Sequence, residues 1–309
     1  MQPPFSNRLR IWFLALRPFA YTASILPVLL GFVLSRYAGY RLDLVTAGLL
    51  LVGVLALHTA ANLWNDLFDY RRGLDRTVHP ASGALVRGWL SEGQIRRGAW
   101  ISLFGGIAAA AGVLARSGPG VLWMGAAGLL LACTYTRGGT CLKYLGLGDP
   151  AILIAFGLLP VLTAWWVQTE TWSLFPIVWS APPGVLAVGI LHANNWRDRE
   201  NDAAKGCRTL AVRLGPVGSR RYFQILVLLP WVLVMLYALL GFAGIALFRV
   251  PFPVGAVLVL LPAGWNLAAR DWETTGEQYL ALDARVARLH TLFGVVLILG
   301  FLLGMEMSL

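Results

Sequence analysis

The sequence predicts an all-α integral membrane protein with about nine transmembrane helices around a central cavity and a cytoplasmic N-terminus. Three observations lead there: the composition, a series of long apolar segments, and the distribution of basic residues. Of the 309 residues, 58% are hydrophobic and 13% are charged, and the mean hydropathy is +0.67. Soluble domains carry about 25% charged residues, so the composition places the chain in the membrane class. We interpret residues 1–309 as a single domain.

Nine apolar segments approach the length of about 20 residues that a helix needs to cross the hydrocarbon core of a bilayer. They lie at 18–36, 44–64, 96–115, 119–135, 149–168, 174–194, 220–247, 252–269 and 286–307. Several contain proline or glycine, which membrane helices tolerate when neighbouring groups satisfy the freed backbone. The first segment follows arginines, as in a signal peptide, but no convincing cleavage site is visible and further spans follow. We therefore predict that it is the first span.

The basic residues fall almost entirely on one side of the nine predicted spans. Of the 25 lysines and arginines, 21 share the side of the N-terminus, and four lie on the other side: Arg36, Arg41, Arg116 and Arg249. Cytoplasmic loops of membrane proteins carry such an excess, which predicts a cytoplasmic N-terminus and a C-terminus outside. The net charge of +10 is then explained by loops that face an anionic leaflet. Too few residues remain outside the apolar segments for a nucleic-acid-binding face.

Two polar clusters end the second and the sixth apolar segments. The first contains Asn62, Asp66 and Asp69, and the second contains Asn194, Asp198 and Asp202. On a helix, residues spaced by three, four, seven or eight positions share one face. The two clusters are offset by 132 residues, although the last acid comes at i+7 in the first and at i+8 in the second. This correspondence indicates an internal repeat that is sharpest at the polar positions.

The side chains of these clusters favour a magnesium-bound diphosphate. Carboxylates packed this closely repel one another unless a cation joins them, and hard oxygen ligands suit Mg²⁺. Mg²⁺ commonly takes one or two carboxylates together with phosphate oxygens of a substrate. Two facing acidic stripes are therefore predicted to hold a diphosphate through bridging Mg²⁺. Solvated helix ends are the alternative, but two matching clusters at the ends of membrane helices favour a functional site.

Both clusters and their flanking sequences resemble the UbiA superfamily of membrane aromatic prenyltransferases. The first aspartate motif is matched by Asn62, Asp66 and Asp69 followed by Gly73-x-Asp75, and the second by Asn194, Asp198 and Asp202 followed by the run 205–215. Residues 15–18, 65–75 and 144–149 are most similar to the branch that prenylates 1,4-dihydroxy-2-naphthoate. Asp149 departs mildly, because that branch more often has Glu there. The Pro-x-Ser-Gly at 80–83 is instead similar to branches that prenylate 4-hydroxybenzoate, chlorophyllide or glycerol phosphate lipids.

The resemblance implies a Mg²⁺-dependent enzyme that transfers a polyprenyl group from an allylic polyprenyl diphosphate to an aromatic acceptor. The implied acceptor is 1,4-dihydroxy-2-naphthoate in menaquinone biosynthesis, at the cytoplasmic face of a cell inner membrane crossed several times by the chain. The expected metal ligands are Asn62, Asp66, Asp69, Asn194, Asp198 and Asp202, of which the four aspartates are also the expected catalytic residues. Basic residues expected to bind the diphosphate are Arg72, Lys143, Lys205 and Arg208, and those expected to bind the acceptor are Arg17, Tyr135 and Asp149.

Two alternatives stay open at this stage. A UbiA-type enzyme for another aromatic or lipid acceptor, such as 4-hydroxybenzoate, shares the diphosphate motifs and differs in the acceptor site alone. A membrane transporter is a more distant alternative, because internal repeats and intramembrane carboxylates also occur there. Transporter ion sites usually lie near the midplane of the bilayer, whereas both clusters are predicted at its inner face.

Overall fold

A computed structural model of the chain describes residues 5–16, 21–71, 84–136, 142, 145–204, 206–272, 279 and 281–307. Within these ranges every regular element is helical, which confirms the all-α prediction. The elements are α1 (Phe5–Leu16), α2 (Thr22–Tyr37), α3 (Leu44–Arg71), α4 (Glu92–Ser117), α5 (Gly120–Thr136), α6 (Gly148–Ile152), π-helical η2 (Leu153–Leu158), α7 (Leu159–Thr169), α8 (Leu174–Arg197), α9 (Arg199–Ala204), α10 (Leu210–Phe242), the 3-10 helices η3 (Ala246–Phe248) and η4 (Phe252–Leu260), α11 (Leu261–Ala269) and α13 (Leu282–Glu306).

Seven helical segments of the described chain are long and apolar enough to cross a membrane. They are Leu44–Phe68, Glu92–Ser117, Gly148–Thr169, Leu174–Arg197, Leu210–Phe242, Phe252–Ala269 and Leu282–Glu306. Two shorter apolar helices, Thr22–Tyr37 and Gly120–Ala132, fall on the first and fourth segments predicted from the sequence. The chain is a multi-pass membrane protein, while the count of nine spans and the orientation stay predictions.

Large apolar side chains on the outside of the helices fit a lipid environment. Ile101 of α4 is 73% exposed, Trp123 of α5 is 77% exposed and Leu239 of α10 is 67% exposed, and each lies within an apolar helix. Large exposed apolar surfaces are rare on soluble monomers and mark contact with a membrane or partner. In a bilayer the same side chains lie against acyl chains.

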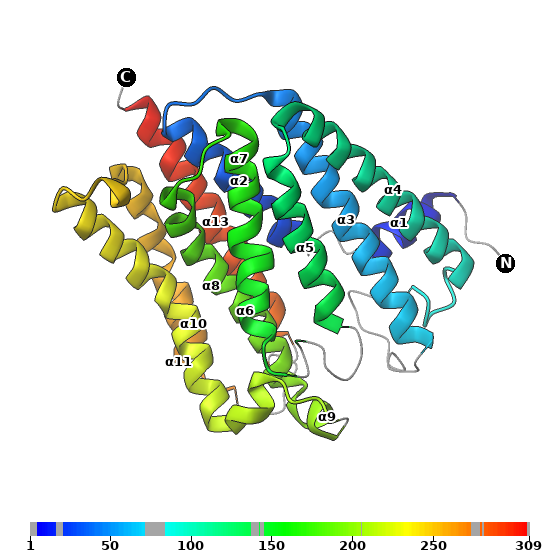
Figure 1. Cartoon of the computed structure of the whole chain (residues 1–309). Helices are drawn as coiled ribbons and strands as arrows, with labels where there is room; N and C mark the ends of the chain where they lie inside the picture. The colour runs from blue at the N-terminus through cyan, green and yellow to red at the C-terminus, as the bar shows by residue number, and fades with distance from the viewer. Residues whose placement is uncertain are drawn as a thin grey trace. The chain divides into compact units, whose positions relative to one another are not determined.

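The chain divides into two compact units, each with its own core. Unit 1 comprises Met1–Ile25 and Leu44–Gly118, and unit 2 comprises Leu26–Asp43 and Pro119–Leu309. In unit 1, α3 and α4 run side by side as a long pair (Figure 1). The C-terminal part of α3 and the N-terminal end of α4 pack with α1 around a core that includes Ile11, Leu63, Leu67 and Ile95. These are the ends predicted to face the cytoplasm.

Helix α1 was not predicted from the sequence. Its twelve residues include Ser6, Asn7, Arg8 and Arg10, so it is too short and too polar for a search that looks for membrane-length apolar segments. It is amphipathic: Ile11 and Ala15 are buried in the core that α1 shares with α3 and α4, whereas Phe13 is exposed. Such a helix packs on the end of a bundle through one face.

Helix α8 forms the centre of unit 2. It packs against α10, α13 and η2 (Figure 1), and 61% of its most apolar stretch is buried, against 22–50% for the other spans of this unit. Its Trp179 is fully buried and contacts Phe301 of α13 edge-on, with ring centroids 5.0 Å apart. The second polar cluster begins at the C-terminal end of this helix, with Asn194.

Candidate active site

The first cluster lies on the C-terminal part of α3, which continues as a helix to Arg71. Asn62 and Asp66 are one turn apart on the same face, and Asp66 is buried. Asp69 lies on the same helix, but its side chain is outside the described structure. The Asn62 Nδ2 atom is buried and has no hydrogen-bond partner among the described residues. A buried amide in that condition marks a place where a ligand or water is to be expected.

The second cluster does not lie on one continuous helix, and that part of the prediction is wrong. Helix α8 ends at Arg197, Asp198 has φ −90° and ψ 7°, and α9 begins at Arg199. The sequence here is rich in Asp and Asn, which compete with helical hydrogen bonds and favour helix ends. The three residues still follow one another by one helical turn across this break, because Asp198 N donates to Asn194 O at 3.0 Å and Asp202 N donates to Asp198 O at 2.8 Å.

The guanidinium of Arg197 lies among the oxygen atoms of the second cluster. Its Nε and Nη2 donate to the two carboxylate oxygens of Asp198 at 3.0 and 3.1 Å, and Nη2 also donates to Asn194 Oδ1. Its Nη1 donates to Asp283 Oδ2 of α13 at 2.9 Å. The side chains of Asn194 and Asp198 therefore converge on one positive group, as a cation site at these residues requires.

The sequence reasoning missed both partners of this arrangement. Arg197 was counted as one basic residue among many, although its place between Asn194 and Asp198 was a usable signal. Asp283 carried no signal, because 86 residues separate it from Arg197 and no helix periodicity connects them.

The donor set fits a magnesium ion that is shared with a substrate. Among the described residues, no group of three His, Cys, Asp or Glu side chains is placed to hold a metal ion. Asn194 and Asp198 nevertheless bring hard oxygen atoms to a single cation, the Arg197 guanidinium. Mg²⁺ needs no more than one or two carboxylates when phosphate oxygens and water complete its octahedron. The residues thus fit a metal that arrives with a diphosphate better than a closed protein cage.

Arg213 joins the two loops that carry most of the predicted diphosphate-binding residues. Its Nη2 donates to Leu145 O at 2.8 Å and its Nε donates to Arg208 O at 3.2 Å. Gly146 has φ 71° and leaves room for this contact, since a Cβ there would lie 2.9 Å from Arg213 Nε. Arg208 itself is exposed. Lys143, Lys205 and Arg72 lie outside the described residues, as does Arg17 of the predicted acceptor set.

Asp149 and Tyr135, predicted to bind the acceptor, lie close together in unit 2. Asp149 is 4% exposed. The Tyr222 side chain is the hydrogen-bonding neighbour of its carboxylate, but no contact to either oxygen meets strict hydrogen-bond geometry in the described part of the chain. A methyl group added at the adjacent Gly148 would be 3.7 Å from the Tyr135 hydroxyl. A buried carboxylate without full hydrogen bonding is costly for a folded protein, and such groups concentrate at functional sites.

His192 of α8 is a fully buried neighbour of Asp149. Its Nδ1 lies 3.9 Å from Asp149 Oδ2, and its Nε2 donates to the carbonyl oxygen of Ser219 at 3.1 Å. Because a carbonyl can only accept, this contact puts a proton on Nε2. The ring of Tyr222 meets the imidazole edge-on at 4.7 Å. Together these side chains give Asp149 a polar but water-poor surrounding.

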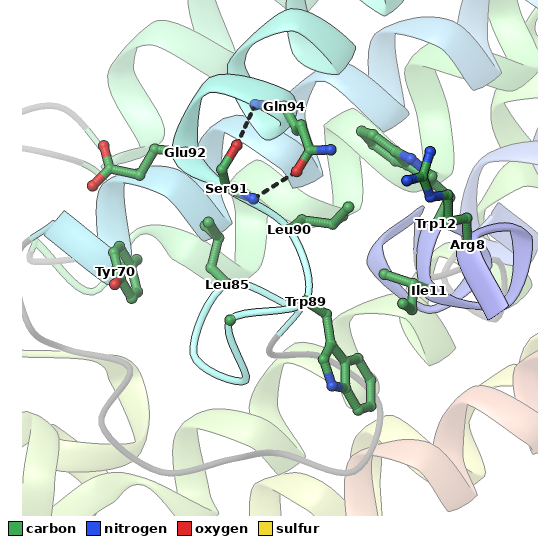
Figure 2. A pocket seen from close by; sticks show the side chains of 11 residues that line it. Arg8, Ile11, Trp12, Tyr70, Leu85, Trp89, Leu90, Ser91, Glu92 and Gln94 are labelled. Carbon is green, nitrogen blue, oxygen red and sulfur yellow. Dashed lines mark hydrogen bonds between the residues drawn. The ribbon is translucent and has the colours of Figure 1, made fainter. Parts of the chain in front are cut away.

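A hollow of about 480 Å³ in unit 1 adjoins the end of the first cluster helix. Figure 2 shows that its wall includes Tyr70 of α3, Arg8 of α1, and the reciprocal cap in which Ser91 and Gln94 bond each other's backbone at the start of α4. The cap satisfies backbone groups that the first turn of a helix leaves unpaired. It also fixes where α4 begins and so how the chain returns past the end of α3.

Comparison with known proteins extends these observations to nearly the whole chain. A sequence model of the UbiA prenyltransferase family matches residues 24–292. The UbiA prenyltransferase domain-containing protein 1 of Homo sapiens is 32% identical over 299 residues, which cover 94% of this chain and 83% of that protein. The 1,4-dihydroxy-2-naphthoate octaprenyltransferase of Escherichia coli (strain K12) is 31% identical over 231 residues, which cover 72% of this chain and 74% of the enzyme.

Solved structures agree with the fold. A UbiA homologue from Archaeoglobus fulgidus, solved bound to GPP and Mg²⁺, superposes with a TM-score of 0.61 at 18% identity, and the match covers 93% of this chain and 99% of that one. A UbiA homologue from Aeropyrum pernix K1 in its apo form gives a TM-score of 0.65 at 19% identity, with 91% and 98% covered. With the family match spanning both units, this chain belongs to the UbiA prenyltransferase family and is a prenyltransferase.

Proposed function

We propose that this enzyme transfers a polyprenyl group from an allylic polyprenyl diphosphate to an aromatic acceptor with the help of Mg²⁺, and that the acceptor is 1,4-dihydroxy-2-naphthoate. The observation that carries the diphosphate half is the convergence of Asn194 and Asp198 oxygens on one cationic group. The acceptor half is supported by the naphthoate octaprenyltransferase relative and by the buried Asp149 next to Tyr135. The product then belongs to menaquinone biosynthesis.

The chemistry of the diphosphate half follows from charge. Mg²⁺ bound by the two clusters would neutralise the diphosphate and so make it a better leaving group. The allylic C–O bond breaks and its electron pair stays on the diphosphate oxygen. Arg72, Lys143, Lys205 and Arg208 would donate charge-assisted hydrogen bonds to the oxygens on which this charge accumulates. Donors fixed in advance lower the barrier because they need no reorganisation during the reaction.

The acceptor half consumes the electron-deficient allylic carbon. An electron-rich ring carbon of the acceptor forms the new C–C bond, and the acceptor carboxylate leaves as CO₂ while its electron pair restores the aromatic ring. We propose that Asp149 and Tyr135 orient the acceptor through its hydroxyl groups, together with Arg17. A water-poor surrounding such as that of Asp149 also protects the allylic cation from hydrolysis.

The side of the membrane on which this happens is part of the proposal. The distribution of 21 basic residues against four supports a cytoplasmic N-terminus, which puts both clusters at the cytoplasmic face of a cell inner membrane. We also propose the single-domain organisation and the central cavity that the sequence predicts. The family match across residues 24–292 supports both.

A direct test compares Asp66→Ala and Asp198→Ala with wild-type enzyme in membranes, with Mg²⁺ and with EDTA. Losing a metal ligand that stabilises the leaving group is expected to reduce prenyl transfer by about 100-fold or more. Asp271→Ala is the matched control, because Asp271 is an exposed acid outside both clusters that pairs with Arg220 at 3.5 Å. Wild-type transfer by both cluster variants contradicts the proposal. Prenylation of 4-hydroxybenzoate in preference to 1,4-dihydroxy-2-naphthoate contradicts the acceptor alone.

A further inference from the structure

Unit 2 contains an open groove that the proposed reaction does not use. It has a volume of about 820 Å³ and lies between α11 and α13. Arg270, Arg285 and Arg288 line it near the end of α11 and the start of α13, and Leu267, Leu289 and Leu292 line it one to two turns further along these helices. None of these residues belongs to either polar cluster.

Three arginines line this groove, and the guanidinium groups of two of them lie over one indole. Trp272 is buried, and its Nε1 donates to Leu267 O at 2.8 Å, which fixes the ring. The Cζ atoms of Arg270 and Arg285 lie 5.4 and 5.9 Å from the ring centroid. Arg288 follows Arg285 by three positions on α13 and therefore projects from the same face. The groove thus concentrates positive charge on a rigid support.

The neighbouring described acids are committed to other partners. Asp271, next to Arg270, pairs with Arg220 at 3.5 Å, and Asp283, two residues before Arg285, pairs with Arg197 at 2.9 Å. Among the described residues, no carboxylate forms an ion pair with Arg270, Arg285 or Arg288. Like charges held together in this way favour an anion between them.

The apolar wall restricts the kind of anion. Leu267 belongs to the span Phe252–Ala269, while Leu289 and Leu292 belong to the span Leu282–Glu306, so the groove runs from the arginines along two membrane-spanning segments. The Asp283–Arg197 contact places the start of α13 at the same end of unit 2 as the second cluster. On the proposed orientation, that end faces the anionic cytoplasmic leaflet. An anion that carries an acyl tail fits both ends of the groove.

From this combination we infer that the groove between α11 and α13 binds the phosphate headgroup of an anionic glycerophospholipid, with an acyl chain along the leucine wall. Basic pockets between membrane helices on the cytoplasmic side are suited to such headgroups. Guanidinium groups bind phosphate oxygens in pairs, and a tryptophan at this depth matches the interfacial position that the residue favours.

The test measures lipid binding by the whole protein in nanodiscs. Wild type is reconstituted in phosphatidylcholine alone and with phosphatidylglycerol added, and bound lipid is counted by native mass spectrometry alongside the Tm. Retained phosphatidylglycerol and a higher Tm are expected for wild type. Arg285→Gln combined with Arg288→Gln is expected to weaken retention by about tenfold or more, since each basic residue near an anionic surface contributes on the order of 1 kcal/mol.

The control removes the same charge elsewhere. Arg96→Gln combined with Arg97→Gln changes two exposed arginines of α4 and is expected to leave phosphatidylglycerol retention unchanged. Arg285→Lys combined with Arg288→Lys keeps the charge and is expected to restore most of the retention, which excludes misfolding as the cause of the loss. Equal loss in the α4 variant overturns the proposal, because general charge attraction then explains the binding.

Two competing ligands give separate outcomes. If millimolar inorganic phosphate displaces phosphatidylglycerol, the site recognises a free anion and the lipid assignment is wrong. If geranyl diphosphate displaces it, the groove is an extension of the substrate site and the proposal is equally wrong. The sequence also has Glu273 and Glu277 before α13. Wild type could show no preference for phosphatidylglycerol while the double variant Glu273→Gln, Glu277→Gln does show one. That result would mean that these glutamates already neutralise the arginines, and it would contradict the proposal.

Discussion

At the scale of single residues, Arg197 decides how available the second cluster is to a metal. Its fork engages both carboxylate oxygens of Asp198, so a metal at Asp198 must share these oxygens with it or displace it. Asp283 offers the guanidinium a second partner on α13. A residue with two acidic partners can release one while keeping the other, and a bidentate pair of this kind is geometrically demanding.

Asp283→Asn is therefore expected to raise the Mg²⁺ concentration that gives half-maximal prenyl transfer. Without the charge of Asp283, Arg197 is held more tightly by Asp198 and competes better with the metal. The expected change is roughly tenfold or more, since a hydrogen bond to a charged group contributes about 1.5–3 kcal/mol. Asp271→Asn changes an exposed ion pair and is expected to leave the Mg²⁺ dependence as it was. A Mg²⁺ titration in which the two variants coincide contradicts this role for Asp283.

A second prediction at this scale concerns the buried Asp149. Asp149→Asn keeps the shape and removes a buried charge whose hydrogen-bonding neighbour in the described chain is the Tyr222 side chain. If this residue serves the acceptor, KM for the aromatic acceptor rises while KM for the prenyl diphosphate stays constant. Stability is expected to stay equal or rise by about 1 kcal/mol, because a poorly paired buried polar group is unfavourable. Lower thermal stability with unchanged acceptor kinetics indicates a purely structural role.

At the scale of helices, a close approach of two glycines sets the distance between η2 and α8. A Cβ on Gly157 would lie 2.8 Å from the Cα of Gly184, and small residues allow membrane helices to approach in this way. The π-helical turn 153–158 ends two residues before Pro160, which cannot donate a backbone hydrogen bond. The turn and the two glycines position α6, and with it Asp149, against α8.

Gly157→Ala is expected to lower stability by about 1–3 kcal/mol, because the added methyl meets backbone that cannot give way. The measurement is thermal unfolding in detergent, with acceptor KM as a second readout. Gly125→Ala in α5 is the matched control: a Cβ there meets nothing within 4 Å, and alanine has the higher helix propensity. That variant is expected to be neutral or slightly stabilising. Equal Tm values for the two variants contradict the close-contact account.

At the scale of the whole molecule, the sequence predicted the features that depend on local spacing and missed those that depend on contacts in the folded chain. The apolar spans and the Asn62–Asp66 stripe on α3 depend on local spacing, and they were predictable. Helix α1 was missed because its twelve residues combine polar and apolar side chains and rely on packing against unit 1. The break at Asp198 depends on local competition for hydrogen bonds that helical spacing does not report. The Arg197–Asp283 contact required the folded chain.

Topology gives the last prediction, because it links the charge distribution to the position of both clusters. In a variant with Cys133, Cys141 and Cys207 replaced by alanine, single cysteines are introduced as Arg41→Cys in a predicted outer loop and Glu200→Cys beside the second cluster. Arg41 and Glu200 are both exposed, so a membrane-impermeant maleimide can reach either one from its own side. With 21 basic residues against four, the inner side is expected to contain Glu200.

In intact cells Arg41→Cys is then labelled at once, whereas Glu200→Cys is labelled only after the membrane is permeabilised. Retained prenyl transfer in each variant shows that the labelled protein is folded. The reverse pattern would place the second cluster outside, and labelling of both cysteines in intact cells would mean that the number of spans between residues 41 and 200 is even. In either case the second cluster would face away from the cytoplasm, and the proposed cytoplasmic site together with the anionic-leaflet position of the arginine groove would have to be abandoned.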